Sequence, residues 1–287
     1  MSINAACKLL GYARSTFFEV RQNGISRKEK DEIIEEFVLE KVKEIRKEQK
    51  RIGGRKMYYL ICKYEEKKLY KFGRKKFFEI LKKHNLLVKK RKKRAITTDS
   101  KLWRGQYPDL VKELIPSRPE QVWVADITYF RTKNGFIYGH LLTDGYSKKL
   151  VGFEVADDMK ATSTLVALKM AIKNRMYDEE LIHHSDRGFQ YLSRVYTDFL
   201  KAHKIRISVT QDGSPYDNAV AERINGILKD EFDFGGIFDT LEQAKELLEK
   251  VAEIYNDKRP HWSNSLLTPN EMHQQREMKI KTWRSKK

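Results

Sequence analysis

Apolar and polar residues follow two different periods along the chain, and the period changes near residue 119. Before that point apolar residues recur every three or four positions, which is typical of amphipathic helices. The pattern predicts a short helical pair within residues 2–23, a helix over 29–50, and two shorter helices before a basic run at 89–94. The helical pair is similar to the second half of a helix-turn-helix, with a plain helical hairpin as the alternative.

From residue 119 the pattern becomes that of strands. Three runs rich in β-branched and aromatic residues follow one another with short turns between them, which predicts an antiparallel meander. The expected strands are 122–130, 136–143, 150–155, 181–185 and 205–210, and the expected helices are 162–173, 191–202, one starting at 219, and 241–256. This order, with mixed strand pairing, predicts a mixed α/β (α+β) chain whose core has a ribonuclease-H-like fold.

Composition shifts divide the chain into five expected regions. They are a helix-turn-helix-like segment (1–28), a basic helical DNA-binding domain (29–95), a linker (96–118), a ribonuclease-H-like catalytic core (119–235), and a C-terminal helix with a basic tail that completes the core (236–287). The linker is assigned from its prolines, Pro108 and Pro116, and from its polar stretch TTDS.

Charge narrows the class of partner. The 58 Lys and Arg residues exceed the 40 Asp and Glu residues, which gives a formal net charge of +18. Such an excess favours a polyanion, with nucleic acid ahead of an anionic membrane surface. Cys7 and Cys62 form no CxxC pair, so neither a disulfide framework nor a zinc finger is expected. Because no apolar run reaches the roughly 18 residues that span a bilayer, we expect a cytoplasmic protein without a membrane partner.

Three acidic residues stand at positions where carboxylates are unusual or well placed for chemistry. Asp126 lies inside the apolar strand VWVADITYF, where an unpaired carboxylate is costly. Asp186 follows the short strand LIHHS, and Glu222 begins a helix behind a Gly/Pro loop. Individually they could be a satisfied structural acid, a helix cap and a surface residue. Together they predict a cluster, because the first and fourth strands of this fold are neighbours.

Three clustered carboxylates suit hard divalent cations better than one-proton acid–base catalysis. Mg²⁺, with Mn²⁺ as a substitute, accepts oxygen ligands and keeps positions open for water and phosphate. Two such ions would support in-line displacement at phosphorus. His183 and His184 lie beside this cluster in sequence, and we expect them to support Asp186 rather than to bind metal.

The motifs around the acids resemble the transposases of the IS-three family of bacterial insertion sequences, within the retroviral integrase superfamily. They are WVADITYF, HHSDRGFQY, GSPYDNAVAE and the closing motif YNDKRPHWSNSLLTPNEM at 255–272. The resemblance covers residues 119–272 and implies that Asp126, Asp186 and Glu222 are the catalytic, metal-binding acids. Between the last two acids lie 35 residues (187–221), the spacing of this family. Arg223 departs from the serine common at that position.

This resemblance implies a second-frame transposase protein that nicks the 3′ ends of an insertion sequence and joins them to target DNA. The implied partners are double-stranded DNA, namely the terminal inverted repeats and the target, further copies of the chain in a synaptic complex, and a first-frame protein. The implied location is the bacterial nucleoid. Two alternatives are a DNA-binding regulator that has lost the chemistry, and a nuclease acting on RNA–DNA hybrids.

Candidate DNA contacts come from the basic run, the helix starts and the loops near the acids. Lys229, seven residues after Glu222, matches the basic residue that follows the family's glutamate, and we expect it to contact a phosphate near the cleaved end. Tyr216 and Asn218 belong to a stretch expected to form a mobile flap. The full set is Lys229, Arg187, Gln190, Tyr216, Asn218, Arg55, Arg74, Lys75, Arg91 and Arg94.

Overall fold

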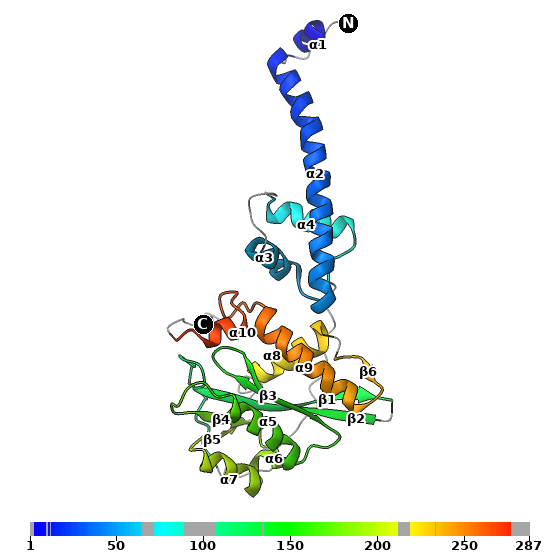
Figure 1. The fold of residues 1–287 in the computed structure, drawn as a ribbon. Helices are drawn as coiled ribbons and strands as arrows, with labels where there is room; N and C mark the ends of the chain where they lie inside the picture. Colours follow the sequence, from blue (N-terminus) through cyan, green and yellow to red (C-terminus); the bar gives the residue numbers. More distant parts are fainter. Residues whose placement is uncertain are drawn as a thin grey trace. The chain divides into compact units, whose positions relative to one another are not determined.

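The computed structural model describes residues 3–9, 11, 13–64, 72–88, 107–133, 135–211, 219–232 and 234–276 (Figure 1). The chain divides into two compact units. One comprises residues 1–48 and 52–90, and the other comprises 49–51 and 91–287. The first unit is helical and the second contains the sheet, so each is described by itself.

The helical unit contains one long helix and three short ones. They are α1 (Ile3–Leu9), α2 (Arg14–Glu48), α3 (Gly54–Tyr64) and α4 (Arg74–Lys83). The second half of α2 packs with α3 and α4 around a core that includes Val38, Met57, Phe77 and Leu81. This packing follows the apolar stripe expected for residues 29–50.

One prediction for this unit is wrong. The second helix of the expected N-terminal pair and the helix at 29–50 form a single 35-residue helix, α2, which runs through position 28. The residues between them include Gly24 but no proline, and an interior glycine costs a helix only about 1 kcal/mol. The expected break at Gly11 is present: this glycine has φ +69, a conformation that ends a helix readily.

The second unit is built on one mixed sheet. Its strands are β1 (Val122–Thr132), β2 (Gly135–Asp144), β3 (Leu150–Ala156), β4 (Ile182–Ser185), β5 (Arg206–Val209) and β6 (Ile237–Phe238). The order is β3-β2-β1-β4-β5, and β6 pairs with the end of β1. The β1–β2 and β2–β3 pairs are antiparallel, and the β1–β4 and β4–β5 pairs are parallel. This is the ribonuclease-H-like arrangement that the sequence predicted.

Helices cover both faces of the sheet (Figure 1). One face carries α5 (Ala161–Lys173), α6 (Phe189–Leu192) and α7 (Arg194–Ala202), and the other carries α8 (Ala219–Glu231) and α9 (Leu241–Lys258). Alternation along β1 sends Trp123 and Ala125 into the core under α5 and sends Phe130 into the core under α8 and α9. Gly152 of β3 permits close packing on α5, since a Cβ there would collide with the Ala167 carbonyl oxygen.

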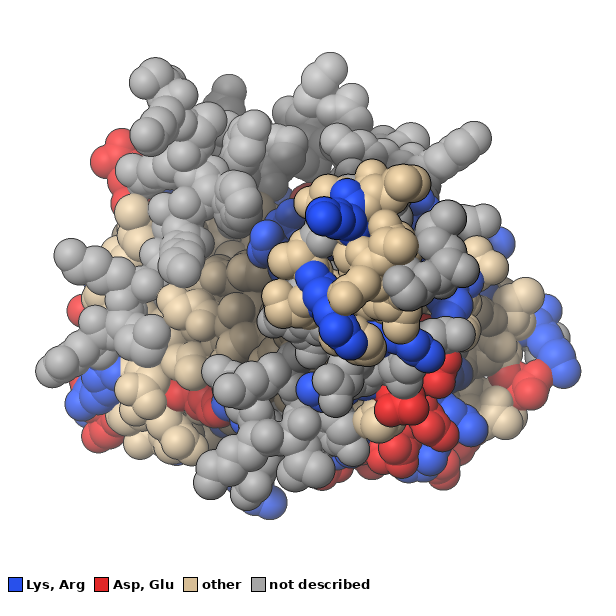
Figure 2. Space-filling view, turned by 90° about the horizontal axis from the view of Figure 1, so that it is seen from above, with Lys and Arg blue, Asp and Glu red and all other residues tan. Residues whose placement is uncertain are grey.

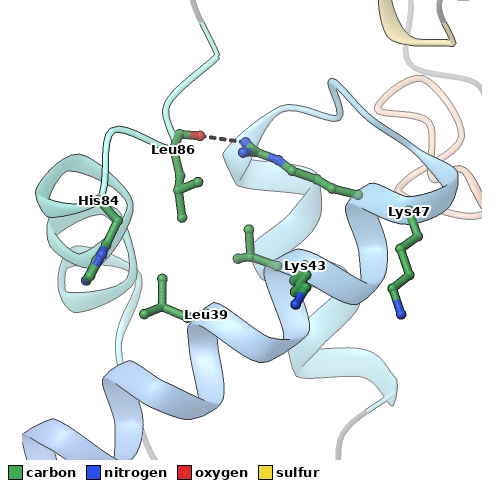
Figure 3. A pocket seen from close by; sticks show the side chains of 7 residues that line it. Leu39, Lys43, Lys47, His84 and Leu86 are labelled. Atoms are coloured by element: carbon green, nitrogen blue, oxygen red, sulfur yellow. Dashed lines mark hydrogen bonds between the residues drawn. The ribbon is translucent and has the colours of Figure 1, made fainter.

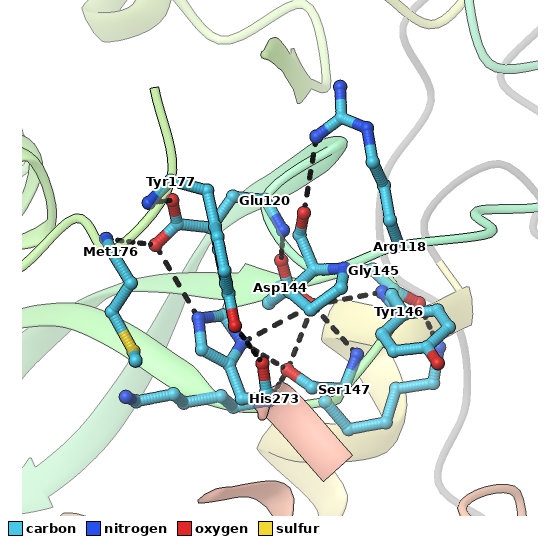
Figure 4. Close-up of polar contacts among 12 residues, drawn as sticks. Arg118, Glu120, Asp144, Gly145, Tyr146, Ser147, Met176, Tyr177 and His273 are labelled. Carbon is cyan, nitrogen blue, oxygen red and sulfur yellow. Dashed lines mark hydrogen bonds and ion pairs between the residues drawn. The ribbon is translucent and has the colours of Figure 1, made fainter. Parts of the chain in front are cut away.

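A short last helix, α10 (Pro269–His273), is anchored to the sheet by a buried polar cluster (Figure 4). Asp144, at the end of β2, accepts hydrogen bonds from the Glu120 and Ser147 backbone N–H groups, each at 2.7 Å. His273 Nδ1 lies 2.8 Å from Ser147 Oγ. Burial opposes ionisation of Glu120, but hydrogen bonds from His273 and from the Met176 backbone lower its pKa. The cluster therefore stabilises the start of β1 and the end of β2 together.

Residues 107–118, within the expected linker, pack on this unit. Leu110, Val111 and Leu114 contact a buried group that contains Val122 and Val124. The division of the chain into five regions stays a prediction.

Candidate active site

Asp126 lies in the middle of β1 on the face covered by α8. Asn225 Nδ2 donates a hydrogen bond to Asp126 Oδ2 at 2.6 Å. The pKa of Asp126 is raised to about 7 by burial, by the negative charge of Asp186 and, more weakly, by that of Glu222. Hydrogen bonds from Asn225 and the Ile127 backbone oppose this rise. The three acids therefore interact electrostatically at one place.

Asp186 directly follows β4, the strand that pairs in parallel with the start of β1. Its Oδ1 accepts a hydrogen bond from the Gly188 N–H at 2.9 Å, which holds the turn into α6. The residue reaches the surface, yet surrounding protein partly desolvates its carboxyl group and raises its pKa. A group that is accessible and electrostatically strained is suited to binding a cation.

Glu222 lies in the first turn of α8 and is exposed. Asn225 and Lys229 follow at one and two turns along the same helix, as the sequence indicated. The buried side of α8 carries Ile224 and Leu228, which pack into the core. This packing keeps Glu222 near the edge of β1 while leaving its carboxylate accessible.

One edge of β1 is unpaired at its centre, which leaves room for the three acids to lie close together. On the side toward β4, β1 pairs with β4 only at residues 122–124 and with β6 only at 131–132. Among the described residues, no strand pairs with 125–130 on that side. Asp126 therefore lies in an opening of the sheet, with the end of β4 on one side and α8 beside it.

The site fits a cation by its chemistry, although a finished ligand cage is not formed. In the part of the chain that the structure describes, no group of three or more His, Cys, Asp or Glu side chains is arranged to hold a metal ion. Two observations favour a cation. The first is the repulsion between the carboxylate of Asp126 and the charges of Asp186 and Glu222, and the second is the environment of Asn225 Oδ1. That oxygen is buried and has no hydrogen-bond partner among the described residues.

Two histidines next to Asp186 belong to the core. His183 Nε2 lies 2.9 Å from the Tyr196 hydroxyl, and His184 Nδ1 lies 2.9 Å from Ser208 Oγ. Burial lowers the pKa of His183 to about 3, so its imidazole is neutral. These contacts hold β4 against α7 and β5, and whether the histidines also support Asp186 stays a prediction.

One contact of the site was not predicted, whereas Tyr191 had been expected from the sequence to line the DNA path beside Gln190. The sequence showed that Asn225 shares a helix face with Glu222, but nothing in it indicated a hydrogen bond to Asp126. Tyr191 of α6 is buried, and its pKa is raised well above the usual value, first by burial and then by the charges of Asp126 and Asp186. It therefore lies near both acids as part of the wall of the site.

The predicted DNA contacts occupy several places. Lys229 Nζ lies 4.4 Å from the centroid of the Tyr129 ring. Arg187 Nε donates to the Thr210 carbonyl oxygen at 3.0 Å, and Gln190 lies in α6 beside Asp186. In the helical unit Arg55, Arg74 and Lys75 are exposed. Tyr216, Asn218, Arg91 and Arg94 lie outside the described residues, as does the rest of the expected flap.

In Figure 2 the Lys and Arg residues that the structure describes occur alongside Asp and Glu residues. The helical unit also has a groove of about 530 Å³ (Figure 3). It is lined by Leu39, Val42, Lys43, Arg46, Lys47, His84 and Leu86. Arg46 donates a hydrogen bond to the Leu86 carbonyl oxygen, which joins α2 to the segment that follows α4. None of the predicted DNA contacts lines this groove.

Comparison with known proteins identifies the class of protein to which this chain belongs. Two families, both described as an integrase core domain, match residues 116–215 and 203–269. Together these matches include Asp126, Asp186 and Glu222. The chain is thus an integrase-core protein.

Three relatives narrow the assignment. The insertion element IS600 31 kDa protein of Shigella sonnei is 33% identical over 191 residues, which are 66% of this chain and 70% of that protein. Transposase InsF for insertion sequence IS3A of Escherichia coli is 35% identical, over 55% of each chain. The putative transposase for IS986/IS6110 of Mycobacterium tuberculosis is 41% identical, over 43% of this chain and 46% of that protein. The chain belongs to the IS3 (IS-three) family of insertion-sequence transposases.

The match covers about half the length of two of these relatives, InsF and the IS986/IS6110 transposase. Among solved structures, the HTLV-2 integrase catalytic core domain in complex with magnesium is 20% identical, over 54% of this chain and 97% of that chain, with a TM-score of 0.44. A chain in the structure of a simian T-cell lymphotropic virus intasome is 18% identical, over 81% of this chain and 75% of that chain, with a TM-score of 0.48. In the described part of the protein, no helix is long and apolar enough to cross a membrane.

Proposed function

We propose that this chain is a DNA transposase that nicks the 3′ ends of its insertion sequence and transfers them to target DNA. The observation that carries the proposal is the position of Asp126 at the open edge of β1, next to the end of β4, which Asp186 follows, and next to α8, which carries Glu222 and the Asn225 donor to Asp126. Membership in a family of insertion-sequence transposases supports the same reaction class.

In the proposed reaction, water attacks a phosphodiester and releases a 3′-hydroxyl, which then attacks a second phosphodiester. Asp126, Asp186 and Glu222 would hold two Mg²⁺ ions, or Mn²⁺ in their place, and none of the three acts as a nucleophile. Two bound ions supply activation of the attacking oxygen and stabilisation of the leaving oxygen. Asn225 orients Asp126 through its 2.6 Å hydrogen bond, and Lys229 provides positive charge for a phosphate.

The proposed substrates are duplex DNA with the terminal inverted repeats of the element and a target duplex. Joining two ends in one event requires more than one protomer, so a synaptic complex of several copies is part of the proposal. A first-frame protein is proposed as a partner, and the bacterial cytoplasm at the nucleoid as the location.

The test uses the full chain with labelled duplex that carries the ends of the element. Denaturing gels would separate products formed with Mg²⁺, Mn²⁺ or EDTA. We expect nicking at the 3′ end with either metal, and none with EDTA.

Asp186→Asn and Glu222→Gln should abolish nicking while DNA affinity, measured in EDTA, stays close to that of the wild type. If the wild-type chain binds but does not cut, even after the first-frame protein is added, a DNA-binding regulator becomes the better assignment. Cleavage of RNA–DNA hybrids in preference to the element ends would instead favour the nuclease.

A further inference from the structure

One end of the sheet exposes an apolar face beside the candidate active site. Tyr129 of β1 and Phe136 of β2 are each 51% exposed, and Ile237 of β6 is 67% exposed. Arg131 pairs with Phe136 on one side and with Ile237 on the other. Because directly paired residues project from the same face of a sheet, these side chains form one surface.

Alternation along β1 fixes which face this is. Trp123 and Ala125 point into the core under α5, so Tyr129 and Arg131 project from that same face. In Figure 1 the ends of β1 and β2 extend beyond α5, α6 and α7. The surface formed by Tyr129, Phe136 and Ile237 therefore belongs to the part of the sheet that these helices leave uncovered.

The surface is ordered and carries positive charge. The Tyr129 and Phe136 rings meet edge to face, with centroids 5.5 Å apart and an interplanar angle of 90°. Lys229 Nζ lies 4.4 Å from the Tyr129 centroid, within the range of a cation–π contact. Arg131 is exposed beside both rings, whereas the Lys133 ammonium forms an ion pair with Asp239 at 2.6 Å.

The surface lies across the open edge of β1 from the acids. Tyr129 follows Asp126 by three residues, so it projects from the opposite face of the strand, about 10 Å further along it. Lys229, from the helix that covers the Asp126 face, reaches the Tyr129 ring at this edge. Successive bases of one DNA strand rise by about 3.4 Å, so this distance corresponds to about three base steps.

We propose that Tyr129 and Phe136 form a stacking surface for a DNA base about three nucleotides from the phosphodiester held at the acids. This inference rests on the proposed function. Aromatic rings next to cationic side chains bind unpaired bases with little sequence preference, because every base presents a π-face while the cations attract the backbone. The positive charge of Lys229 and Arg131 favours this polyanion over an apolar patch of another protein.

The experiment compares the wild type with Tyr129→Leu, Tyr129→Phe and Phe136→Leu in EDTA, so that no cleavage occurs. Fluorescence anisotropy would give the affinity for a short single-stranded oligonucleotide derived from the element end. We expect Tyr129→Leu to weaken binding about fivefold or more and Tyr129→Phe to bind within about twofold of the wild type.

Salt dependence separates stacking from phosphate contact. Loss of an aromatic ring releases no counterions, so Tyr129→Leu should keep the slope of log affinity against log salt. Lys229→Gln should reduce that slope by about 0.7, the value for one phosphate contact on single-stranded DNA. Trp262→Leu is the matched control, because Trp262 is 46% exposed but lies outside the β1–β2 hairpin. It should bind as the wild type does.

A second measurement tests which nucleotide stacks on Tyr129. An oligonucleotide with 2-aminopurine three nucleotides from the scissile phosphate should show quenching that disappears in Tyr129→Leu but is retained in Tyr129→Phe. Circular dichroism would show that the variants are folded.

Three results would overturn the proposal: wild-type affinity in folded Tyr129→Leu, an equal loss in Trp262→Leu, or loss of a wild-type dimer in Tyr129→Leu without a change in DNA affinity. The last result would assign the surface to contact between copies. These results concern binding alone, so they are distinguishable from failure of the proposed function, which is failure of the wild type to cut with metal.

Discussion

Replacing Asn225 with alanine tests whether α8 organises the acids. Asn225 Nδ2 is the side-chain donor to Asp126 Oδ2 at 2.6 Å. Burial and the charges of Asp186 and Glu222 oppose ionisation of Asp126, and only the hydrogen bonds from Asn225 and from the Ile127 backbone favour it. A hydrogen bond to a charged group contributes about 1.5–3 kcal/mol, which corresponds to about a 10- to 150-fold change in rate. Alanine has the highest helix propensity, so α8 should remain folded.

The assay measures the initial rate of 3′ nicking while Mg²⁺ is varied, with DNA affinity measured separately in EDTA. We expect nicking by Asn225→Ala to fall by at least about tenfold, with the largest loss at low Mg²⁺, because Asn225 acts through the orientation of Asp126. Asn270→Ala is the matched control, since Asn270 donates the same type of hydrogen bond to Asp257 on an exposed surface. A rate within twofold of wild type, or an equal fall in DNA affinity, would refute this role.

Two further predictions concern the rest of the chain. Removing residues 1–95 should make the salt dependence of DNA binding shallower, by about 0.9 in slope for each phosphate that the shortened chain no longer neutralises; an unchanged slope would show that this basic region does not bind DNA. The pKa of His183 is lowered from 6.5 to about 3 in the folded state, so the unfolded chain binds a proton that the folded chain does not. Stability from this source is present above pH 6.5 and is lost toward pH 3, by about 1.4 kcal/mol per pH unit. Urea unfolding at pH 7.5 and 5.5 should show a smaller loss for folded His183→Gln than for the wild type, and equal losses would contradict the assignment.

The sheet was predictable because its sequence pattern is strongly local. The run VWVADITYF combines β-forming residues with one acid, and the structure places that acid on the face of β1 next to α8. The short strand before Asp186 was recognisable from its apolar start and from the turn that Gly188 allows. Which acids lie together followed from strand order, since β1 and β4 are neighbours in this fold.

Other features were hidden because they depend on tertiary contacts. The hydrogen bond from Asn225 to Asp126 joins residues 99 positions apart, and no local pattern records it. Strand β6 has only two residues and exists because it pairs with Arg131 and Thr132. By contrast, α10 carried a readable signal, a capping box in which Thr268 and Glu271 bond each other's backbone.

The continuous helix α2 was missed for a different reason. A glycine within a polar stretch normally favours a boundary, and residues 23–28 offered no apolar stripe to argue against one. The helix propensity of the residues on both sides of this stretch was sufficient to continue the helix through it.

The polar cluster at the end of β2 has a consequence for the order in which the protein is made. Ser147 contacts His273, which is 126 residues later, and its carbonyl accepts from Asn264, which is 117 residues later. At bacterial synthesis rates of about 5–20 residues per second, the ribosome needs about 6–25 s to supply that last partner. The central strands therefore remain incompletely stabilised until residue 273 has been translated. A prematurely terminated chain would lack these two partners, and the start of β1 and the end of β2 would lose the hydrogen bonds that join them to the C-terminal segment.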